Sequence, residues 1–270
     1  MFLKKLVLAS SLLLASGIGA QATPVLTLDF STPVTLAASE TPGSWYVDSI
    51  SATPNGFSAV GGQLEEVIGP NAALQYQGRS YLMPDDVVDV RVNLFIDPSW
   101  ATTGREMAFL LGTTRNDTDF LSNVPIIGFT SDGAGPRFQG WNPLAGFWYN
   151  LGIPIGFVYG DHEIGFRLTG PNSLEYLLDS ASIGTIVIAN SDRFYDIGLV
   201  GRSYPDQPGY TILWDDIIAS DASPDGGGSG GGGGGVADVP EPASLTLLGA
   251  GIFGLGMMQK PRIRKTARLS

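Results

Sequence analysis

Hydrophobic and polar residues alternate with a period of two in several stretches of the chain. Residues 90–96 read Val-Arg-Val-Asn-Leu-Phe-Ile, and residues 163–168 read Glu-Ile-Gly-Phe-Arg-Leu. This alternation is typical of strands with one buried face. Turn signals rich in Gly, Pro, Asn and Asp separate such runs, at 54–56, 97–98, 131–133, 170–172 and 205–206. We therefore expect an all-β fold, an antiparallel β-sandwich or jelly roll, over residues 23–220.

Two further observations narrow this class. No stretch before residue 240 shows a sustained helical period, and the sequence contains no internal repeat. The absence of a repeat disfavours a propeller or a β-helix.

The N-terminal 22 residues have the three parts of a secretory signal. Lys4 and Lys5 precede an apolar stretch at 6–18, and a small-residue site follows at 20–22. This order predicts a signal peptide, residues 1–22, that signal peptidase removes during export.

A second apolar segment lies near the C-terminus. Residues 243–258 carry no charge, and five cations follow within 259–270. As a helix the segment is about 24 Å long, and the flanking Gln259 and Lys260 extend it toward the ~30 Å of a hydrocarbon core. We expect a transmembrane helix with its basic tail in the cytoplasm and the main domain outside. The alternative is a core helix, which its four glycines disfavour.

Gly226–Gly235 consists of nine glycines and one serine. Such a segment behaves as a flexible coil, so we interpret residues 221–238 as a linker between the domain and the membrane segment.

The charge distribution limits the partners of the main domain. Residues 23–240 contain 25 Asp and Glu against 8 Arg, and no Lys. An acidic surface of this kind repels phosphate backbones, so nucleic acid is not an expected partner. The chain has no Cys, which excludes thiol catalysis.

The C-terminal segment resembles a known sorting signal. Val239, Pro240, Glu241 and Pro242 precede the Gly/Leu-rich span and the Arg-rich tail, and residues 239–270 together are similar to the PEP-CTERM sorting signal. The resemblance implies export in a Gram-negative bacterium and a transient stay in the inner membrane. It also implies cleavage near the motif by exosortase, followed by release to the cell surface.

Three segments, 42–49, 163–185 and 210–220, are similar to strands of the concanavalin A-like lectin and glucanase jelly roll. The resemblance concerns the fold, which does not by itself supply a function. Glucanases of this fold carry a strand of the type Glu-x-Asp-x-x-Glu, and this sequence has no such strand.

The remaining candidates for catalysis are few. Asp161 and Glu163 flank His162, the only histidine, and form either an acid/base pair or the charged start of a strand. No Gly-x-Ser-x-Gly motif is present to hold a nucleophilic serine. We therefore expect that the chain is not an enzyme, with a glycoside hydrolase that uses Asp161 or Glu163 as the remaining alternative.

Calcium is the metal that the sequence best suits, because Ca²⁺ prefers carboxylate and carbonyl oxygens. Asp29 lies on the predicted first strand, and Asp215 and Asp216 lie on the last, where the two strands of a sandwich often meet. The loop 116–119 is a second candidate. Solvated acidic residues explain both groups equally well.

A candidate carbohydrate site lies in a loop-like stretch rich in aromatic residues. Trp141, Asn142, Trp148 and Tyr149 occur among glycines and a proline, and exposed aromatic rings flanked by short polar groups suit sugar binding. The alternative is that these rings cap the core.

These observations lead to three functional hypotheses. The first is a non-catalytic, exosortase-processed surface or extracellular-matrix protein that associates with exopolysaccharide in a biofilm. The second is a purely structural or protein-binding surface module. The third is the glycoside hydrolase.

Overall fold

The computed structural model describes residues 24–48, 51–70, 75–103, 107–204 and 207–221. The predicted signal peptide, most of the linker, the sorting motif, the transmembrane segment and the basic tail lie outside the described residues. Within the described ranges, no helix is long and apolar enough to cross a membrane.

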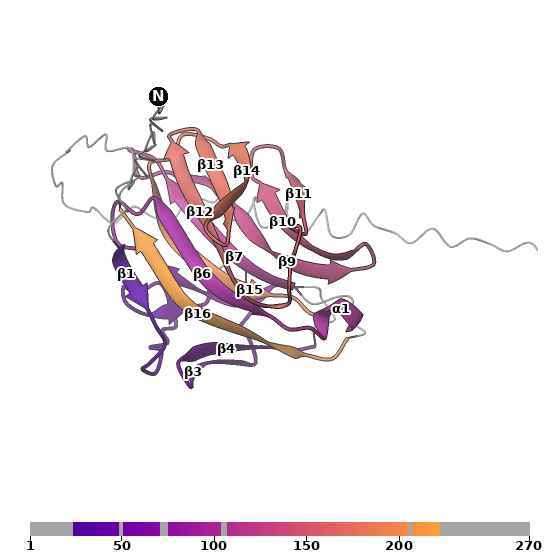
Figure 1. Cartoon of the computed structure of the whole chain (residues 1–270). Helices are drawn as coiled ribbons and strands as arrows, with labels where there is room; N and C mark the ends of the chain where they lie inside the picture. Colours follow the sequence, from indigo (N-terminus) through magenta and orange to yellow (C-terminus); the bar gives the residue numbers. More distant parts are fainter. Residues whose placement is uncertain (1–23, 49–50, 71–74, 104–106, 205–206, 222–270) are drawn as a thin grey trace, which may run out of the picture.

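Two antiparallel sheets pack face to face (Figure 1), as the alternating pattern predicts. Sheet A has the strand order β14-β13-β12-β6-β16-β4-β3, with β1 beside β16. Its strands are β1 (Pro24–Leu28), β3 (Gly56–Val60), β4 (Gln63–Ile68), β6 (Asp89–Ile96), β12 (Gly160–Gly170), β13 (Ser173–Leu178), β14 (Ala181–Val187) and β16 (Tyr210–Ser220).

Sheet B has the order β11-β10-β9-β7-β15-β5-β2, with β8 beside β7. Its strands are β2 (Trp45–Tyr46), β5 (Gln77–Leu82), β7 (Met107–Arg115), β8 (Leu121–Asn123), β9 (Ile126–Asp132), β10 (Gly135–Asn142), β11 (Phe147–Gly152) and β15 (Arg193–Gly201). A short helix, α1 (Trp100–Thr103), follows β6.

The alternating runs form strands because the sandwich buries every second side chain. On β6, Val90, Val92, Leu94 and Ile96 have no exposed surface, whereas the residues between them face outward. On β12, Ile164 and Phe166 are buried in the same way. Both predicted strands are confirmed.

Strands β13 and β14 are joined by a two-residue turn. Asp179 and Ser180 both have positive φ values, 48° and 64°, which a tight hairpin turn of the primed type requires. The side chain of Asp179 supports this conformation because its Oδ1 accepts a hydrogen bond from the Glu163 backbone N–H (3.1 Å).

The first and last strands of the sandwich lie side by side. Pro24 is paired with Ser220, and Thr27 with Ile218. Strand β16 therefore lies in the interior of sheet A, between β6 and β4, with β1 beside its C-terminal half.

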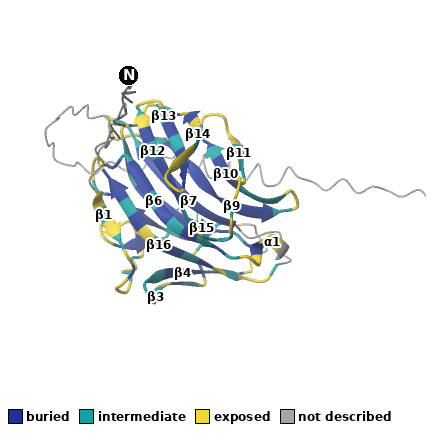
Figure 2. Cartoon of the chain, viewed as in Figure 1, coloured by how far each residue is buried: buried dark blue, intermediate teal, exposed yellow. Residues whose placement is uncertain are grey.

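The main core lies between the sheets, but β7 is buried on both faces (Figure 2). Ala108 and Leu110 point into the main core. Met107, Phe109 and Leu111 belong to a second apolar cluster on the outer face of sheet B. An outer face that buries large apolar residues must be covered, and its cover forms the candidate site.

Candidate functional site on the outer face of sheet B

The outer face of sheet B has an apolar floor with aromatic side chains over it. The floor consists of Met107, Phe109, Leu111, Val124, Ile126 and Val200, all buried. The partly exposed rings that pack against it are Tyr76, Trp141, Trp148 and Tyr204. We call these four rings, together with Arg202, the aromatic face.

The β10–β11 hairpin brings two of the predicted residues together. Trp141 and Trp148 are directly opposite in the strand register, so both side chains point to the same face. Their ring centroids are 5.5 Å apart, and Trp148 lies 5.3 Å from Phe109 of the floor. The turn between the strands uses Gly146 at φ 67°.

The other two predicted residues lie elsewhere. Asn142 is buried, and its Oδ1 accepts hydrogen bonds from the backbone N–H groups of Leu144 (2.9 Å) and Ala145 (3.0 Å). Tyr149 packs against the main core on the opposite side of β11. Asn142 therefore shapes the hairpin turn and Tyr149 caps the core, and only the two tryptophans stay in the candidate site.

Arg202 continues the aromatic face beyond the tryptophans. Its guanidinium carbon lies 5.0 Å from the centroid of Tyr76 and 5.3 Å from that of Tyr204. Tyr76 in turn lies 6.1 Å from Phe109. The face thus runs without a break from Trp141 through Trp148 and Tyr76 to the cation.

Arg202 differs from most other arginines in its partners. Five of the seven described arginines form ion pairs with carboxylates: Arg91, Arg115, Arg137, Arg167 and Arg193. Within the described ranges, Arg202 has no carboxylate partner, and its Nε is buried without a hydrogen bond. Its Nη2 contacts the Met107 sulfur (3.4 Å) and the Tyr204 hydroxyl (3.3 Å).

A buried carboxyl group lies on the same outer face, beside β7 and β5. Asp196 accepts hydrogen bonds from the hydroxyls of Tyr46 (2.9 Å) and Thr113 (2.7 Å). Burial raises the pKa of Asp196 to about 6, although both hydroxyls act in the opposite direction. This carboxyl group fastens the short strand β2 to the sheet.

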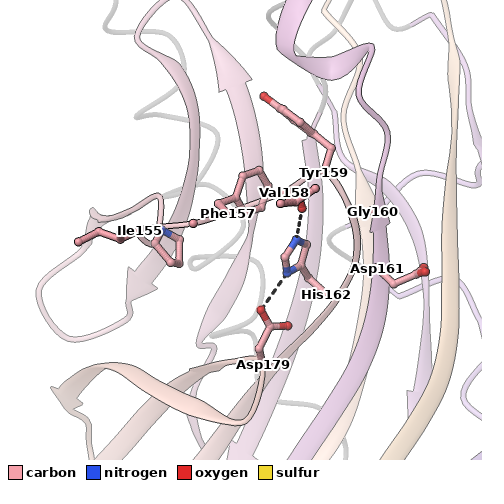
Figure 3. Close-up of a pocket in the computed structure, with 10 residues that line it drawn as sticks. Ile155, Phe157, Val158, Tyr159, Gly160, Asp161, His162 and Asp179 are labelled. Carbon is pink, nitrogen blue, oxygen red and sulfur yellow. Dashed lines mark hydrogen bonds and ion pairs between the residues drawn. The ribbon is translucent and has the colours of Figure 1, made fainter.

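A hollow of about 350 Å³ lies at the end of the sandwich, lined by the loop 154–160 (Figure 3). In it, His162 Nδ1 lies 2.9 Å from Asp179 Oδ2, and Nε2 lies 2.8 Å from the Val158 carbonyl oxygen. The ring stacks on Phe157 with a centroid distance of 4.8 Å. Both partners of the imidazole are acceptors, so both hydrogen bonds form only when the ring carries two protons. His162 thereby fastens the loop to the hairpin turn.

Of the predicted acid/base pair, Asp161 lines this hollow together with the histidine, whereas Glu163 does not. Strand alternation puts Asp161 and Glu163 on the outer face of sheet A and His162 on the interior side, where its ring lies 6.1 Å from Phe138. Figure 3 shows Asp161 pointing away from the His162 ring. Glu163 accepts hydrogen bonds from Arg91 Nη1 (3.1 Å) and Ser180 (2.9 Å). These contacts identify Glu163 as part of an ion-pair network.

The residues predicted to bind calcium come close together on sheet A. Burial raises the pKa of Asp215, and the nearby charges of Asp216, Asp161 and Asp29 raise it further. The backbone N–H and then the hydroxyl of Ser31 lower the pKa of Asp29. In the part of the chain that the structure describes, no group of three or more such ligands is arranged to hold a metal ion. Calcium binding by Asp29, Asp215 and Asp216 stays a prediction.

The second candidate calcium loop uses its polar atoms internally. Asn116 Oδ1 accepts hydrogen bonds from the backbone and hydroxyl of Thr118 and from the Phe120 N–H. Asp119 forms ion pairs with Arg115 (2.8 Å) and Arg193 (2.6 Å).

Comparison with protein families decides the destination of the protein. Residues 238–260 match the model of the PEP-CTERM protein-sorting motif. The chain carries a PEP-CTERM sorting signal. The predicted resemblance is confirmed, and this signal marks an exported protein of a Gram-negative bacterium that is anchored transiently and processed by exosortase. No curated protein matches the chain.

The sandwich itself is similar to solved structures at low identity. A Bacillus licheniformis β-glucanase shares 14% identity over 74% of this chain and 99% of its own, with a TM-score of 0.47. An endo-β-galactosidase from Clostridium perfringens shares 10% identity over 74% of this chain and 63% of its own length, with a TM-score of 0.49. A sialidase shares 11% identity over 66% of this chain and 16% of its own length, with a TM-score of 0.44. The chain therefore spans less than two thirds of two of these three proteins.

These comparisons agree with the predicted jelly-roll class and correct one prediction. The expectation that the chain is not an enzyme is contradicted, because the three structures are named as glycosidases. Likeness at this level concerns the fold and assigns no glycosidase activity to this chain.

Sequence reasoning missed Tyr76, Arg202 and Tyr204. A signal for a covered outer face was present in the run Met-Ala-Phe-Leu-Leu at 107–111, because a continuous apolar run is typical of a strand buried on both faces. That run does not identify the residues, distant in the sequence, whose side chains pack over this outer face.

Proposed function

We propose that the exported protein binds extracellular polysaccharide through the aromatic face of sheet B. The observation that carries the proposal is the pair Trp141 and Trp148, partly exposed and held side by side over a buried apolar floor. Aromatic rings over an apolar floor offer flat surfaces to the faces of sugar rings. The sorting signal supports the proposal because it sends the protein to the compartment where such polysaccharides occur.

The strand register also supports a binding role for this pair. The two rings are fixed by hairpin pairing and by contact with Phe109, so little conformational entropy is lost when a ligand binds. Tyr76 and Arg202 extend the surface, because Tyr76 shares the contact with Phe109 and lies 5.0 Å from the guanidinium carbon. A linear polymer suits such an extended face better than a small molecule does.

Retention on polysaccharide tests the proposal. The processed protein is purified after export and measured on immobilised extracellular polysaccharide from the bacterium that produces it. We expect Trp141→Ala and Trp148→Ala to weaken binding at least about tenfold each. Phe147→Ala is the matched control, because Phe147 neighbours Trp148 on β11, is 48% exposed and lies on the other face.

Two results would contradict the proposal. One is the absence of retention by the wild-type protein, and the other is equal loss of binding in the Phe147→Ala control. Reducing ends released from the polysaccharide are measured in the same samples, so that cleavage of the polymer is not mistaken for weak retention.

A further inference from the structure

We propose that the aromatic face recognises an acidic polysaccharide, with Arg202 as the group that binds a sugar carboxylate. This inference rests on the proposed function and names the class of ligand. It starts from the unusual position of this cation in an acidic domain.

The first step compares Arg202 with the other described arginines, most of which pair with a carboxylate. Residues 23–240 contain about three acidic residues for every arginine, so a carboxylate partner is abundant. Five described arginines form ion pairs with carboxylates, and their shortest nitrogen–oxygen distances are 2.6–2.8 Å. Among the described residues, Arg202 has only aromatic, hydroxyl and thioether neighbours.

The second step is the way in which Arg202 is held. Its guanidinium lies between the rings of Tyr76 and Tyr204, and its backbone N–H donates to the Tyr210 hydroxyl (3.1 Å). A cation that is fixed between rings loses little entropy when an anion arrives. Cation–π contacts stabilise the charge but leave the in-plane hydrogen bonds of the guanidinium open.

The third step is the chemistry of the open positions. Nε is buried and closed to a ligand, so the edge left for a carboxylate is the Nη1–Nη2 pair, where Nη2 has only weak contacts at 3.3 and 3.4 Å. A planar guanidinium binds a carboxylate through two parallel hydrogen bonds, which a neutral sugar hydroxyl cannot reproduce. A uronic acid next to a sugar stacked on the tryptophans would satisfy both parts of the face.

The net negative charge of the domain leads to a second expectation, which concerns the dependence of binding on salt. A polyanion is repelled by the acidic surface at long range and attracted by Arg202 only at contact. The screening length falls from about 30 Å at 0.01 M salt to about 8 Å at 0.15 M. Binding of the acidic polymer should therefore be stronger at 0.15 M than at 0.01 M salt, the reverse of a basic protein.

The experiment compares one polymer in two chemical forms. Extracellular polysaccharide from the producing bacterium is used as isolated and after its carboxyl groups have been reduced to primary alcohols. We expect the processed wild-type protein to bind the native form at least about tenfold more tightly than the reduced form. In Arg202→Gln this difference should disappear.

Arg193→Gln is the matched control. It removes the same charge from the start of β15, whereas Arg202 follows the end of that strand, and Arg193 already pairs with Asp119 and Asp192. This variant should keep the preference for the native polymer.

The outcomes separate the two proposals. Equal binding of both polymers by the wild type, with loss in the tryptophan variants, would overturn the role of Arg202 and leave polysaccharide binding intact. Binding to neither polymer would overturn both. A preference that Arg193→Gln loses as fully as Arg202→Gln would show a general charge effect and would also overturn the assignment.

Discussion

The ion-pair network on the outer face of sheet A and the aromatic face of sheet B deal with their cations in opposite ways. On sheet A, Asp89 is almost buried and binds Arg91 through both oxygens (2.8 and 3.0 Å) and Arg167 through one (2.7 Å). Arg91 also reaches Glu163. On sheet B, Arg202 has no carboxylate partner in the described part of the chain.

The difference shows which face is available to a ligand. Charges that already satisfy one another gain little from a new partner, because they would have to give up good hydrogen bonds. A cation that has no anion to give up gains the whole of a new contact. Sheet A therefore uses its outer face for stability, and we propose that sheet B uses its outer face for recognition.

The largest expected effect is on sheet A. Asp89→Ala should lower the free energy of unfolding by about 3–5 kcal/mol, because it leaves two arginines without their shared carboxylate. Denaturant unfolding measures this change, and polysaccharide binding should stay at the wild-type level. Asp119→Ala is the control, since its side chain is 56% exposed and its ion pairs should contribute about 1 kcal/mol or less. A loss of binding in a folded Asp89→Ala protein would contradict the division between the faces.

The next effect concerns pH. Because the folded state raises the pKa of Asp196 from 3.8 to about 6, the folded protein holds this proton more tightly than the unfolded chain does. The contribution of Asp196 is therefore fully present below pH 4 and is lost as the pH rises to 6, by about 3 kcal/mol. Asp196→Asn should remove this fall from the curve of unfolding free energy against pH. An unchanged curve would show that Asp196 does not titrate in this range.

A smaller stability effect is expected on the aromatic face. Trp148→Ala should lower the free energy of unfolding by about 1–2 kcal/mol, because the ring is only partly buried. Phe138→Ala in the main core should cost about 3–5 kcal/mol. Thermal unfolding and polysaccharide binding are measured for both variants, so that the effect of each ring on stability can be compared with its effect on binding. Trp148→Ala should weaken binding more, and stability less, than Phe138→Ala does, and the reverse pattern would make the ring a core residue.

The smallest effect is expected at the end of the sandwich. His162→Phe keeps a ring against Phe157 but removes the hydrogen bonds to Asp179 and the Val158 carbonyl, with a cost of about 1 kcal/mol. Amide exchange in the loop 153–159 should become faster, while exchange in β7 stays unchanged. Exchange that accelerates in both would show that His162 supports the whole sandwich.

The strands that the sequence predicted are those with one buried face. Alternation located β6 and β12 because their outward residues, apart from Phe95, are polar or small. It did not identify the acid in β4, where Leu64, Glu66 and Ile68 all point inward. Burial raises the pKa of Glu66 well above its ordinary value, with only the Trp214 indole N–H acting against this change. A periodicity rule counts a carboxyl group as polar and places it outside.

The candidate site was predictable only where it is local. Trp141 and Trp148 could be found because they lie on one hairpin, within a few residues of each other. Tyr76 and Arg202 join them only through the strand order β10-β9-β7-β15-β5, which depends on long-range pairing. Alternation within single strands contains no information about that order.

The pairing of β1 with β16 has a mechanical consequence for a protein held by its C-terminus. The chain leaves the sandwich after Ser220, at the end of a strand that is hydrogen-bonded on both sides. A force applied through the C-terminal end of the sandwich is therefore carried by several ladders of hydrogen bonds rather than by a single edge strand. We expect the body to resist being peeled open from this point of attachment.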